Sequence, residues 1–310
     1  MPILLLVIVL LSAGCSGLQS TSSIAPKEQD RVGKLGALVM AHGGSEDWNY
    51  SVEEAIKLLS QEMPTALAFG MANPLSLSNS LESLNAQGVT HVAVVRLFLS
   101  GSSFLEQTRF LLGLSDIPPE FFVLMGPGSK DPNAREQIQH SQVISTHSEG
   151  LINSEYTDSI MLERANSLSS IRSEESVLII AHGMGEEEDN NRLLKSMERV
   201  ARHVANDGYA DVHIATLRED WESKRILAEQ ESRSYVSRQN EAGRRVLVLP
   251  MRLSGFGPYA EVLDGLKYSA GLGLLPHKHI ANWAIKTAYD VSRSSGWNLE
   301  GPRISKITRD

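Results

Sequence analysis

The sequence predicts an α/β protein built from two similar modules, each with a parallel sheet flanked by helices. Short apolar segments alternate with longer segments of helical periodicity, which is typical of strand–helix–strand units. The order of these segments in the first half of the chain recurs in the second half. In addition, one strand of each half ends in the same dipeptide, in "LVMAHGG" (38–44) and "LIIAHGM" (178–184). Together these observations indicate a duplicated fold.

Composition narrows the class of protein further. The chain has 310 residues, 42% of them hydrophobic and 21% charged, which is enough for two domains or for one duplicated fold with a substantial core. The formal net charge of -8 argues against a protein that binds nucleic acid, because such a protein needs a basic face for the phosphates. Cys15 is the only cysteine, which excludes disulfide bonds within the chain and metal sites built from cysteine.

The N-terminal segment 1–15 resembles a secretory signal. Its apolar run, 3–11, is too short to span a bilayer, which takes about 20 residues. The following "LSAGC" resembles a bacterial lipobox, in which Cys15 becomes the lipidated first residue of the mature chain. We therefore expect an exported lipoprotein, anchored to the membrane through Cys15 on the periplasmic or cell-surface side, with a linker over 16–34. No Lys or Arg precedes the apolar run, so an uncleaved membrane-touching tail or a misassigned start stays an alternative.

The first module is expected over 35–125. Its strands are short apolar segments, and its helices are segments in which apolar residues recur at helical spacing. The predicted strands are 35–41, 65–72 and 91–101, and the predicted helices are 51–63, 74–88 and 103–114. The stretch 126–174, which begins with "GPGSKDPNAREQ", is expected to connect the two modules.

The second module is expected over 175–293 and repeats that order. Its predicted strands are 175–183, 210–218 and 244–255, and its predicted helices are 189–207, 222–242, 258–268 and 278–293. In each module we expect one parallel sheet with helices on both faces, wound as in flavodoxin-like folds. Residues 294–310 are expected to form a loose tail.

Glycine-containing turns follow four of the predicted strands. Ligands bind beyond the carboxyl ends of the strands in open parallel sheets, and glycine lets the backbone approach a ligand closely. We therefore expect these turns to gather around a cleft between the modules and to bind a small molecule there. The candidate ligand-binding residues in these turns are Gly43, Gly44, Ser100, Gly101, Gly183, Ser254 and Gly255.

His42 and His182 occupy equivalent strand ends of the two modules. One such histidine alone is readily explained as a residue that caps a strand through a backbone hydrogen bond. Two at equivalent points favour a function, because imidazole is the commonest metal ligand and titrates near neutral pH. The acidic run Glu186 to Asp189 follows His182. It either begins a helix, where carboxylates favour the dipole, or offers a landing site for a hydrated divalent ion.

Aromatic and acidic candidates form matched pairs near the same strand ends. When "SGSSFLEQ" is aligned with "SGFGPYAEV", Phe104 matches Tyr259 and Glu106 matches Glu261. Each ring is a candidate for stacking on a flat ligand, and each carboxylate is a candidate for accepting its protons. A glutamate that only favours the dipole at a helix start has the same sequence signature, so both interpretations stay open.

Arginine and histidine residues complete the set of candidates. Arg96 and Arg252 lie late on their predicted strands, where a guanidinium group is suited to clamp substrate carboxylates. His147 in "STHSEGL", and His277 and His279 in "LPHKHIANW", are looser candidates, because such histidines are commonly surface or loop residues.

Four segments, in their order and duplication, resemble the class II chelatases, specifically the sirohydrochlorin cobalt- and ferrochelatases (CbiX- and SirB-like). They are "LVMAHGGSEDWN", "VAVVRLFLSGSSFLEQT", "LIIAHGMGEEEDN" and "VLVLPMRLSGFGPYAEVLDGL". The resemblance covers most of 35–290. It implies two flavodoxin-like, chelatase-like modules that face each other across a cleft and hold a tetrapyrrole between them.

The same resemblance implies an enzymatic activity. A lyase of this family inserts a divalent metal substrate, Co²⁺ or Fe²⁺, into the macrocycle, as in cobalamin or sirohaem biosynthesis. His42 and His182 match the strand-end histidine of the family, which ligates or delivers the metal while a base removes the pyrrole protons. The implied partners are a tetrapyrrole and a metal ion.

The chain departs from this family at one further position in each module. A second family histidine normally follows the "PLFLS" strand by a few residues. Phe104 stands there in the first module, and Pro258 or Tyr259 in the second. A non-catalytic, lipid-anchored carrier of a tetrapyrrole or a metal is therefore the alternative to the enzyme. A serine hydrolase with "HGG" as its oxyanion loop is excluded, because the sequence has no G-x-S-x-G elbow.

Overall fold

The computed structural model describes residues 32–299. The predicted signal segment with Cys15, most of the predicted linker and residues 300–310 lie outside the described residues. Within the described range, the strands are β1 (Leu35–Ala41), β2 (Thr65–Phe69), β3 (His91–Arg96), β4 (Val143–Thr146), β5 (Glu175–Ala181), β6 (Asp211–Thr216), β7 (Arg245–Met251) and β8 (Ser269–Ala270). The α-helices are α1 (Glu46–Ala55), α2 (Lys57–Glu62), α3 (Pro74–Ala86), α4 (Leu105–Leu111), α5 (Glu155–Leu168), α6 (Glu187–Ala205), α7 (Glu222–Glu241), α8 (Tyr259–Val262) and α9 (Lys278–Ser294). Between residues 32 and 299, none of the helices combines the length and apolar character needed to cross a membrane.

The strands form two four-stranded sheets with the same topology. The strand order is β2-β1-β3-β4 in the first sheet and β6-β5-β7-β8 in the second. All the pairings are parallel. The predicted α/β class, with a helix-flanked parallel sheet in each half, is confirmed. His42 and His182 directly follow β1 and β5, which are the equivalent interior strands of the two sheets.

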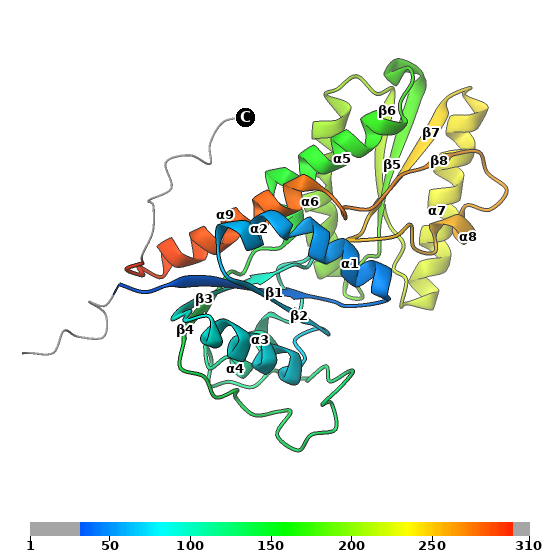
Figure 1. The fold of residues 1–310 in the computed structure, drawn as a ribbon. Helices are drawn as coiled ribbons and strands as arrows, with labels where there is room; N and C mark the ends of the chain where they lie inside the picture. The colour runs from blue at the N-terminus through cyan, green and yellow to red at the C-terminus, as the bar shows by residue number, and fades with distance from the viewer. Residues whose placement is uncertain (1–31, 300–310) are drawn as a thin grey trace, which may run out of the picture. The chain divides into compact units, whose positions relative to one another are not determined.

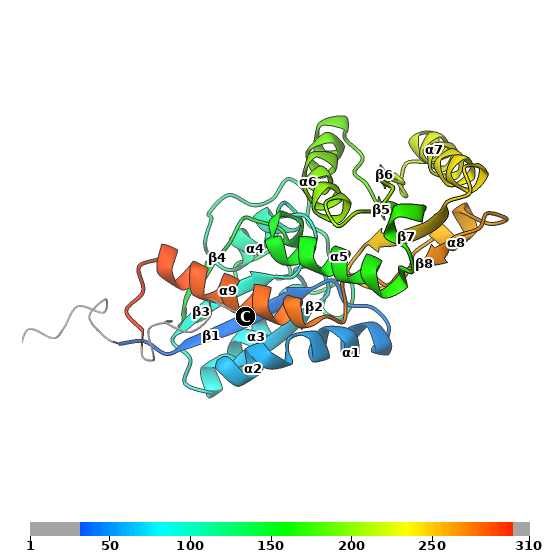
Figure 2. The same ribbon diagram turned by 90° about the horizontal axis from the view of Figure 1, so that it is seen from above.

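Helices cover both faces of each sheet, as purely parallel sheets require. Along one face of the first sheet lie α1, α2 and α9, and along the other lie α3 and α4 (Figures 1 and 2). The second sheet has α5 and α6 on one face and α7 and α8 on the other. This explains why the interior strands read as nearly continuous apolar segments, since both of their faces are buried.

Alternation of side chains along the strands divides the apolar residues among three clusters. Val39 of β1 and Ile179 of β5 belong to the same cluster, whereas their neighbours Met40 and Ile180 belong to two separate ones. The common cluster, here called the shared core, thus receives residues from both sheets. Its other members include Val52, Leu59, Val95, Ile160, Met197, Leu249, Trp283 and Ala288.

The two halves also exchange helices. The last helix, α9, packs against β3 and β4 of the first sheet, whereas α5 packs against β7 of the second. The stretch 126–174, expected as a connection, therefore supplies both the edge strand β4 and a covering helix. The expected tail at 294–310 is held at its start, because Gly33 pairs with Leu299 and donates a hydrogen bond to the Asn298 carbonyl at 2.8 Å.

Each predicted helix has a counterpart in the structure, although bounds shift, as where α1 begins at Glu46, and two helices differ more strongly. The expected helix 51–63 is interrupted at Ile56, whose φ of -102° and ψ of 6° separate α1 from α2. The expected helix 258–268 is reduced to the four residues of α8. Gly265 has a φ of 78°, a left-handed conformation that ends helical backbone. The helix 258–268 was predicted from the spacing of its apolar residues, which takes no account of this glycine.

Replacing Ile160 by alanine tests the shared core. Ile160 is fully buried there, so Ile160→Ala is expected to lower the free energy of unfolding by about 2–5 kcal/mol, measured by urea denaturation followed by far-UV circular dichroism. The matched control is Ile226→Ala on α7, where the side chain is 50% exposed, with an expected change within about 0.5 kcal/mol. Equal effects of the two substitutions would contradict the assignment of the shared core.

Candidate functional site

The loops after β1 and β5 hold their histidines in the same way. Nδ1 of His42 lies 3.0 Å from the carbonyl oxygen of Gly43, and Nδ1 of His182 lies 2.9 Å from that of Gly183. A carbonyl oxygen only accepts hydrogen bonds, so in both rings Nδ1 carries the hydrogen and Nε2 keeps its lone pair when the ring is neutral. Both histidines therefore present an Nε2 that is suited to bind a metal ion or to accept a proton.

Glycine is required at the turn that makes these contacts. Gly43 and Gly183 have φ values of 79° and 88°, in the left-handed region that L side chains rarely adopt. A Cβ atom on Gly183 would lie 2.9 Å from the backbone nitrogen of Arg218, and one on Gly43 would lie 3.0 Å from the Cβ of Phe69. The sequence had marked both glycines as ligand-binding residues. Their observed role is to shape the loop beside each imidazole.

Carboxylates lie beside His182. Its Nε2 is 3.2 Å from Oδ2 of Asp220 and 3.9 Å from Oε2 of Glu219, and both residues belong to the loop after β6. The loop after β2, at the equivalent place in the first half, reads Gly70-Met71-Ala72 and has no carboxylate. The second half thus combines an imidazole nitrogen with carboxylate oxygens, a donor set suited to borderline divalent metals.

Glu219 is fixed by two further residues of the second half. Nη1 of Arg252 donates to its Oε1 at 2.6 Å, and the hydroxyl of Tyr259 donates to the same oxygen at 3.2 Å. Tyr259 is fully buried, and burial together with the Glu219 charge raises its pKa, so the hydroxyl stays protonated. Arg252 therefore clamps a carboxylate of the protein, and the Tyr259 ring does not lie open for stacking on a flat ligand.

A cavity of about 880 Å³ lies between elements of the two halves. Ser100, Gly101 and Ser102 line it from the loop after β3, and Met184 lines it from the loop after His182. The wall formed by α6 contributes the charged residues Asp189, Arg192, Lys195, Glu198, Arg199 and Arg202. The expected meeting of strand-end loops at one cleft thus holds for the loops after β3 and β5.

His42 faces a different hollow. The loop His42 to Gly44 lines a cavity of about 500 Å³ together with Phe69, Asn73 and Met125. Ser254 and Gly255 lie in the loop after β7, where Gly255 has a φ of 76°. The structure therefore distributes the predicted strand-end residues over more than one surface.

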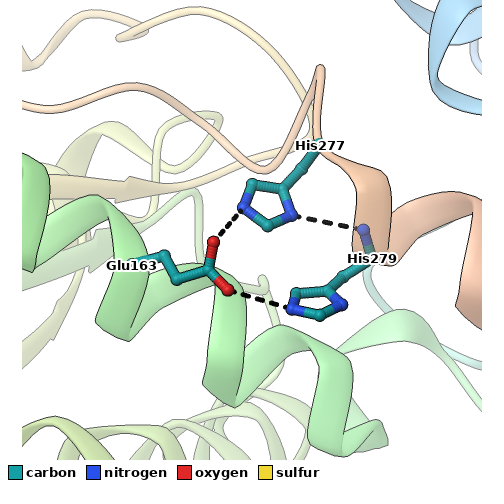
Figure 3. Close-up of side chains that lie close together, drawn as sticks. All are labelled: Glu163, His277 and His279. Atoms are coloured by element: carbon teal, nitrogen blue, oxygen red, sulfur yellow. Dashed lines mark hydrogen bonds and ion pairs between the residues drawn. The ribbon is translucent and has the colours of Figure 1, made fainter. Parts of the chain in front are cut away.

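His277 and His279 are brought together with a residue that the sequence did not single out. The Glu163 carboxylate of α5 lies between the two imidazoles, which come from the start of α9 (Figure 3). Burial and the charge of Arg164 lower the pKa of His277, so this ring is neutral at neutral pH. The three side chains form a cluster of their own, in addition to the His182 site.

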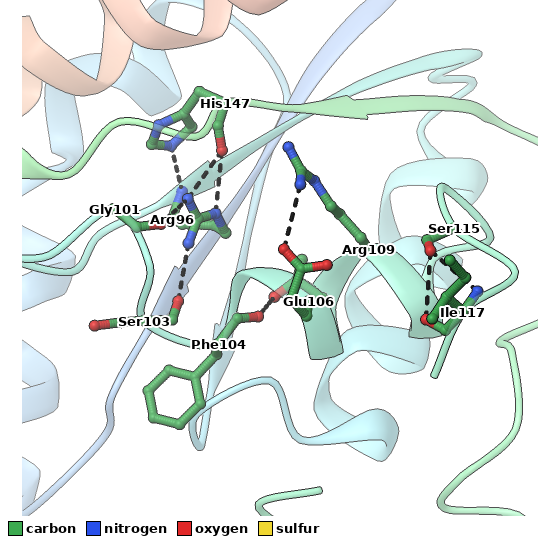
Figure 4. A network of polar contacts seen from close by, with 10 residues as sticks. Arg96, Gly101, Ser103, Phe104, Glu106, Arg109, Ser115, Ile117 and His147 are labelled. Atoms are coloured by element: carbon green, nitrogen blue, oxygen red, sulfur yellow. Dashed lines mark hydrogen bonds and ion pairs between the residues drawn. The ribbon is translucent and has the colours of Figure 1, made fainter. Parts of the chain in front are cut away.

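The Arg96 side chain binds backbone carbonyl groups. Its side chain is 1% exposed, and its guanidinium group donates to the carbonyl oxygens of Ser103 at 2.8 Å, Gly101 at 2.7 Å and His147 at 2.9 Å (Figure 4). Burial and the charge of Arg109 lower its pKa to about 10, so it is a cation at neutral pH. This arrangement differs from the expected clamp on substrate carboxylates, because the donors are already taken by the loops that Arg96 joins.

His147 belongs to the same network. Its Nε2 accepts a hydrogen bond from the backbone nitrogen of Arg96 at 2.9 Å, and its ring meets the edge of Trp283. Burial and the Arg96 charge lower the pKa of His147 to about 4. His147 is therefore a neutral acceptor that joins the ends of β3 and β4.

The matched pair of aromatic and acidic residues does not form a stacking site in the first half. The Phe104 ring packs 5.1 Å from that of Phe98, against the cluster that contains Met40. Glu106 is 63% exposed and pairs with Arg109 on its own helix at 3.3 Å (Figure 4). Glu261 is exposed on α8.

The acidic run forms the first turn of α6. Glu187 pairs with Arg218 at 3.1 Å and with Lys224 at 2.8 Å, and these hydrogen bonds lower its pKa to about 2. Glu188 and Asp189 pair with Arg192 on the same helix. The helix-start interpretation explains the run, since its carboxylates lie at the positive end of the helix and have cationic partners.

Sequence reasoning missed Glu219 and Asp220. They follow β6, whose carboxyl end in "TLRED" was a strand end like the others, but it carries no glycine that marks a ligand-binding turn. The tryptophans that meet the two histidine rings edge-on, Trp48 at 6.4 Å and Trp221 at 6.1 Å, were also unmarked.

The buried His147 predicts a pH dependence of stability. In the folded state its pKa is about 4, below the ordinary value of 6.5. Between these two pH values the unfolded state therefore binds a proton that the folded state does not bind. The free energy of unfolding is therefore expected to fall by about 2–3 kcal/mol as the pH drops from 6.5 to about 4. His147→Gln keeps an acceptor without titrating and should remove this part of the slope in urea denaturation. The exposed control His203→Gln should retain it, and the same slope in all three proteins would disprove the assignment.

Comparison with known proteins supports the fold. No protein-family model matches the sequence, and no curated protein matches it. Among solved structures, SirB from Bacillus subtilis with Fe³⁺ is similar, with a TM-score of 0.60, 15% identity, and coverage of 85% of this chain and 98% of that chain. The sirohydrochlorin chelatase SirB from Bacillus subtilis subspecies spizizenii, in complex with cobalt, has a TM-score of 0.56 and 14% identity, over 85% of this chain and 97% of that chain.

A third similar structure is a multi-domain protein from Deinococcus radiodurans that has structural similarity to chelatases and two additional domains. Its TM-score is 0.55 at 16% identity, and the match covers 83% of this chain and 54% of that chain. The resemblance first seen in the strand-end segments is thus matched by the arrangement of the two sheets. The chain has the chelatase fold of the sirohydrochlorin chelatases.

Proposed function

We propose that the protein is a metallochelatase that inserts Co²⁺ or Fe²⁺ into a sirohydrochlorin-like tetrapyrrole. The observation that carries the proposal is His182, whose Nε2 lies 3.2 Å from the Asp220 carboxylate and 3.9 Å from that of Glu219, so that a metal cation can take the place of a proton between them. The chelatase fold supports it, because similar structures include a SirB with Fe³⁺ and a sirohydrochlorin chelatase with cobalt.

Metal transfer is the first task of the His182 site. A borderline divalent cation binds imidazole nitrogen and carboxylate oxygen, and the contact with Gly183 holds the ring with its lone pair outward. Arg252 and Tyr259 hold Glu219 in place, whereas the Asp220 side chain is 71% exposed and free to turn. During transfer, the metal substrate moves to the macrocycle nitrogens from two carboxylates, of which Glu219 is held in place and Asp220 is able to turn away.

Proton removal is the second task. Insertion binds the metal to the four nitrogens of the macrocycle, breaks two N–H bonds and releases two protons. Asp220 and His182 are the acceptors that the structure offers, and solvent reaches the exposed Asp220. Glu106 and Glu261, the bases expected from the sequence, lie on α4 and α8, where Glu106 pairs with Arg109.

The cavity beside α6 offers room and charge for the macrocycle. Its volume of about 880 Å³ lies within the ordinary range for ligand pockets. Lys195 and Arg202 are exposed cations of its wall, suited to bind carboxylates on the rim of the macrocycle. Arg199 is committed elsewhere, because it binds Asp158 at 2.9 Å and the Ile152 carbonyl at 2.6 Å.

A non-catalytic carrier of a tetrapyrrole or metal is the second candidate. The carrier is favoured by the residues found at the two positions where the family normally has its second histidine. Phe104 is partly buried and packs against a core cluster there, and Tyr259 is buried against Glu219, so neither replaces an imidazole. A carrier also suits the export and lipidation at Cys15 expected from the sequence.

Activity of histidine variants distinguishes the two candidates. Purified protein mixed with sirohydrochlorin and Co²⁺ or Fe²⁺ is expected to accelerate the absorbance change of insertion. His182→Ala should slow the reaction by at least about 100-fold, because it removes both a metal ligand and a base, and His42→Ala should slow it less. His203→Ala on the exposed side of α6 is the matched control and should retain full activity. Pigment binding without acceleration would reject the enzyme and leave the carrier.

The exposed cations on α6 allow a test of where the macrocycle binds. The double variant Lys195→Gln with Arg202→Gln is expected to weaken sirohydrochlorin binding by about fivefold in fluorescence titration, with a shallower salt dependence, since two exposed cations are lost. Lys57→Gln on the exposed surface of α2 is the control and should bind like the unchanged protein. Unchanged affinity in the double variant would place the macrocycle elsewhere.

A further inference from the structure

Glu163, His277 and His279 form a compact group of metal-binding side chains. Oε2 of Glu163 lies 3.2 Å from Nε2 of His277, and its Oε1 lies 3.0 Å from Nε2 of His279. One ligand atom from each of the three residues lies within 4.8 Å of the other two. Ligand atoms around tetrahedral Zn²⁺ are about 3.3 Å apart, given bonds of about 2.0–2.1 Å. The two carboxylate-to-imidazole distances are thus already close to those of a coordination sphere.

Neighbouring residues hold the group in this arrangement. Arg164, next to Glu163 on α5, donates to the carbonyl oxygens of Gly273 at 3.0 Å and Pro276 at 2.7 Å, which fixes the loop that precedes His277. The two imidazole rings stack with centroids 5.0 Å apart, and the Tyr156 ring lies 5.7 Å from that of His279. The side chains are therefore positioned before any ion binds, which lowers the cost of ordering them.

Access and burial differ across the group. The side chains of His277 and His279 are 10% and 19% exposed, whereas that of Glu163 is 47% exposed. The two imidazoles are thus sheltered, while the carboxylate between them is open to solvent. A cation entering from this side keeps room for one or more water ligands.

We propose that Glu163, His277 and His279 bind a divalent transition-metal cation, such as Zn²⁺ or Co²⁺, with water completing its coordination. Two imidazole nitrogens and one carboxylate oxygen are a donor set typical of such ions, whereas Mg²⁺ and Ca²⁺ prefer oxygen alone. The proposal is independent of the proposed function, because none of its ligands belongs to the His182 site.

Binding of the cation replaces hydrogen bonds that the group makes without it. Nδ1 of His277 accepts from the backbone nitrogen of His279 at 3.3 Å, so in the neutral ring Nε2 carries the hydrogen that faces Glu163. A metal on Nε2 moves this hydrogen to Nδ1 and ends the capping contact at the start of α9. His279 has a buried Nδ1 with no hydrogen-bond partner among the described residues, so no contact at Nδ1 fixes the tautomer of its ring.

The cation would join two helices that the fold has exchanged. Glu163 lies on α5, which packs against the second sheet, and the histidines lie at the start of α9, which packs against the first sheet. Because the unfolded chain does not bring these residues together, an ion bound here stabilises the folded state.

Cobalt binding tests the site in the full chain. The background is the double variant His42→Ala with His182→Ala, so that any Co²⁺ bound is not held by those histidines. This variant is expected to bind one equivalent of Co²⁺ with visible absorption bands of four- or five-coordinate cobalt, and to melt at a higher temperature with Co²⁺ or Zn²⁺. Adding Glu163→Gln should weaken Co²⁺ binding by about tenfold or more and remove the rise in melting temperature. His279→Gln, the second ligand variant, should do the same.

The matched control is Glu155→Gln, an exposed glutamate on the same helix, which should bind Co²⁺ like the background. Circular dichroism establishes that each variant is folded. Absence of cobalt bands in the background, or bands that survive both Glu163→Gln and His279→Gln, would overturn the proposal. Loss of chelatase activity with intact cobalt bands would instead concern only the His182 site.

Discussion

The remaining structure depends on apolar packing in the shared core, the layer between the two sheets. β1 and β5 each direct alternate side chains into it, and α5 and α9 are crossed over so that each covers the other half's sheet. On the face toward this layer, each sheet is covered in part by a helix from the other half of the chain. The first needs α9, which comes last, and the second needs α5, which precedes β5. Consequently the described residues 32–299 belong to one compact unit in which the shared core joins the two sheets, while each sheet keeps a smaller cluster of its own on its other face.

The shared core also influences where the candidate sites lie. Because both sheets are anchored in it, the loops after β3 and β5 reach the same cavity, with α6 as its charged wall. The same crossing of α5 and α9 brings Glu163 beside the two histidines at the start of α9. The Glu163 cluster thus follows from helix exchange, whereas the His182 site is built from the strand-end loops of the second half.

The two halves share a topology but have diverged in their use of polar residues. Arg96 at the end of β3 satisfies backbone carbonyls and joins β3 to β4 through His147. Arg252, just beyond β7, holds the Glu219 carboxylate beside His182 instead. The first half has therefore become a supporting half at this position, while the second keeps an imidazole with carboxylates.

The sequence by itself determined the fold class, the strands that end in His42 and His182, and the order of helices between them. These features follow from local periodicity, since alternating burial of strands and helical spacing of apolar residues are written in neighbouring residues. The glycines after each histidine were visible in the sequence as candidates for close approach to a ligand, but their left-handed backbone was seen only in the structure. What sequence could not supply were the partners of polar groups. Glu163 and His279 are 116 positions apart, and Arg96 and His147 are 51 apart. Only the packing of α5 against α9, and of β4 against β3, decided that these side chains meet, because long-range contacts depend on how apolar faces pair and not on local spacing.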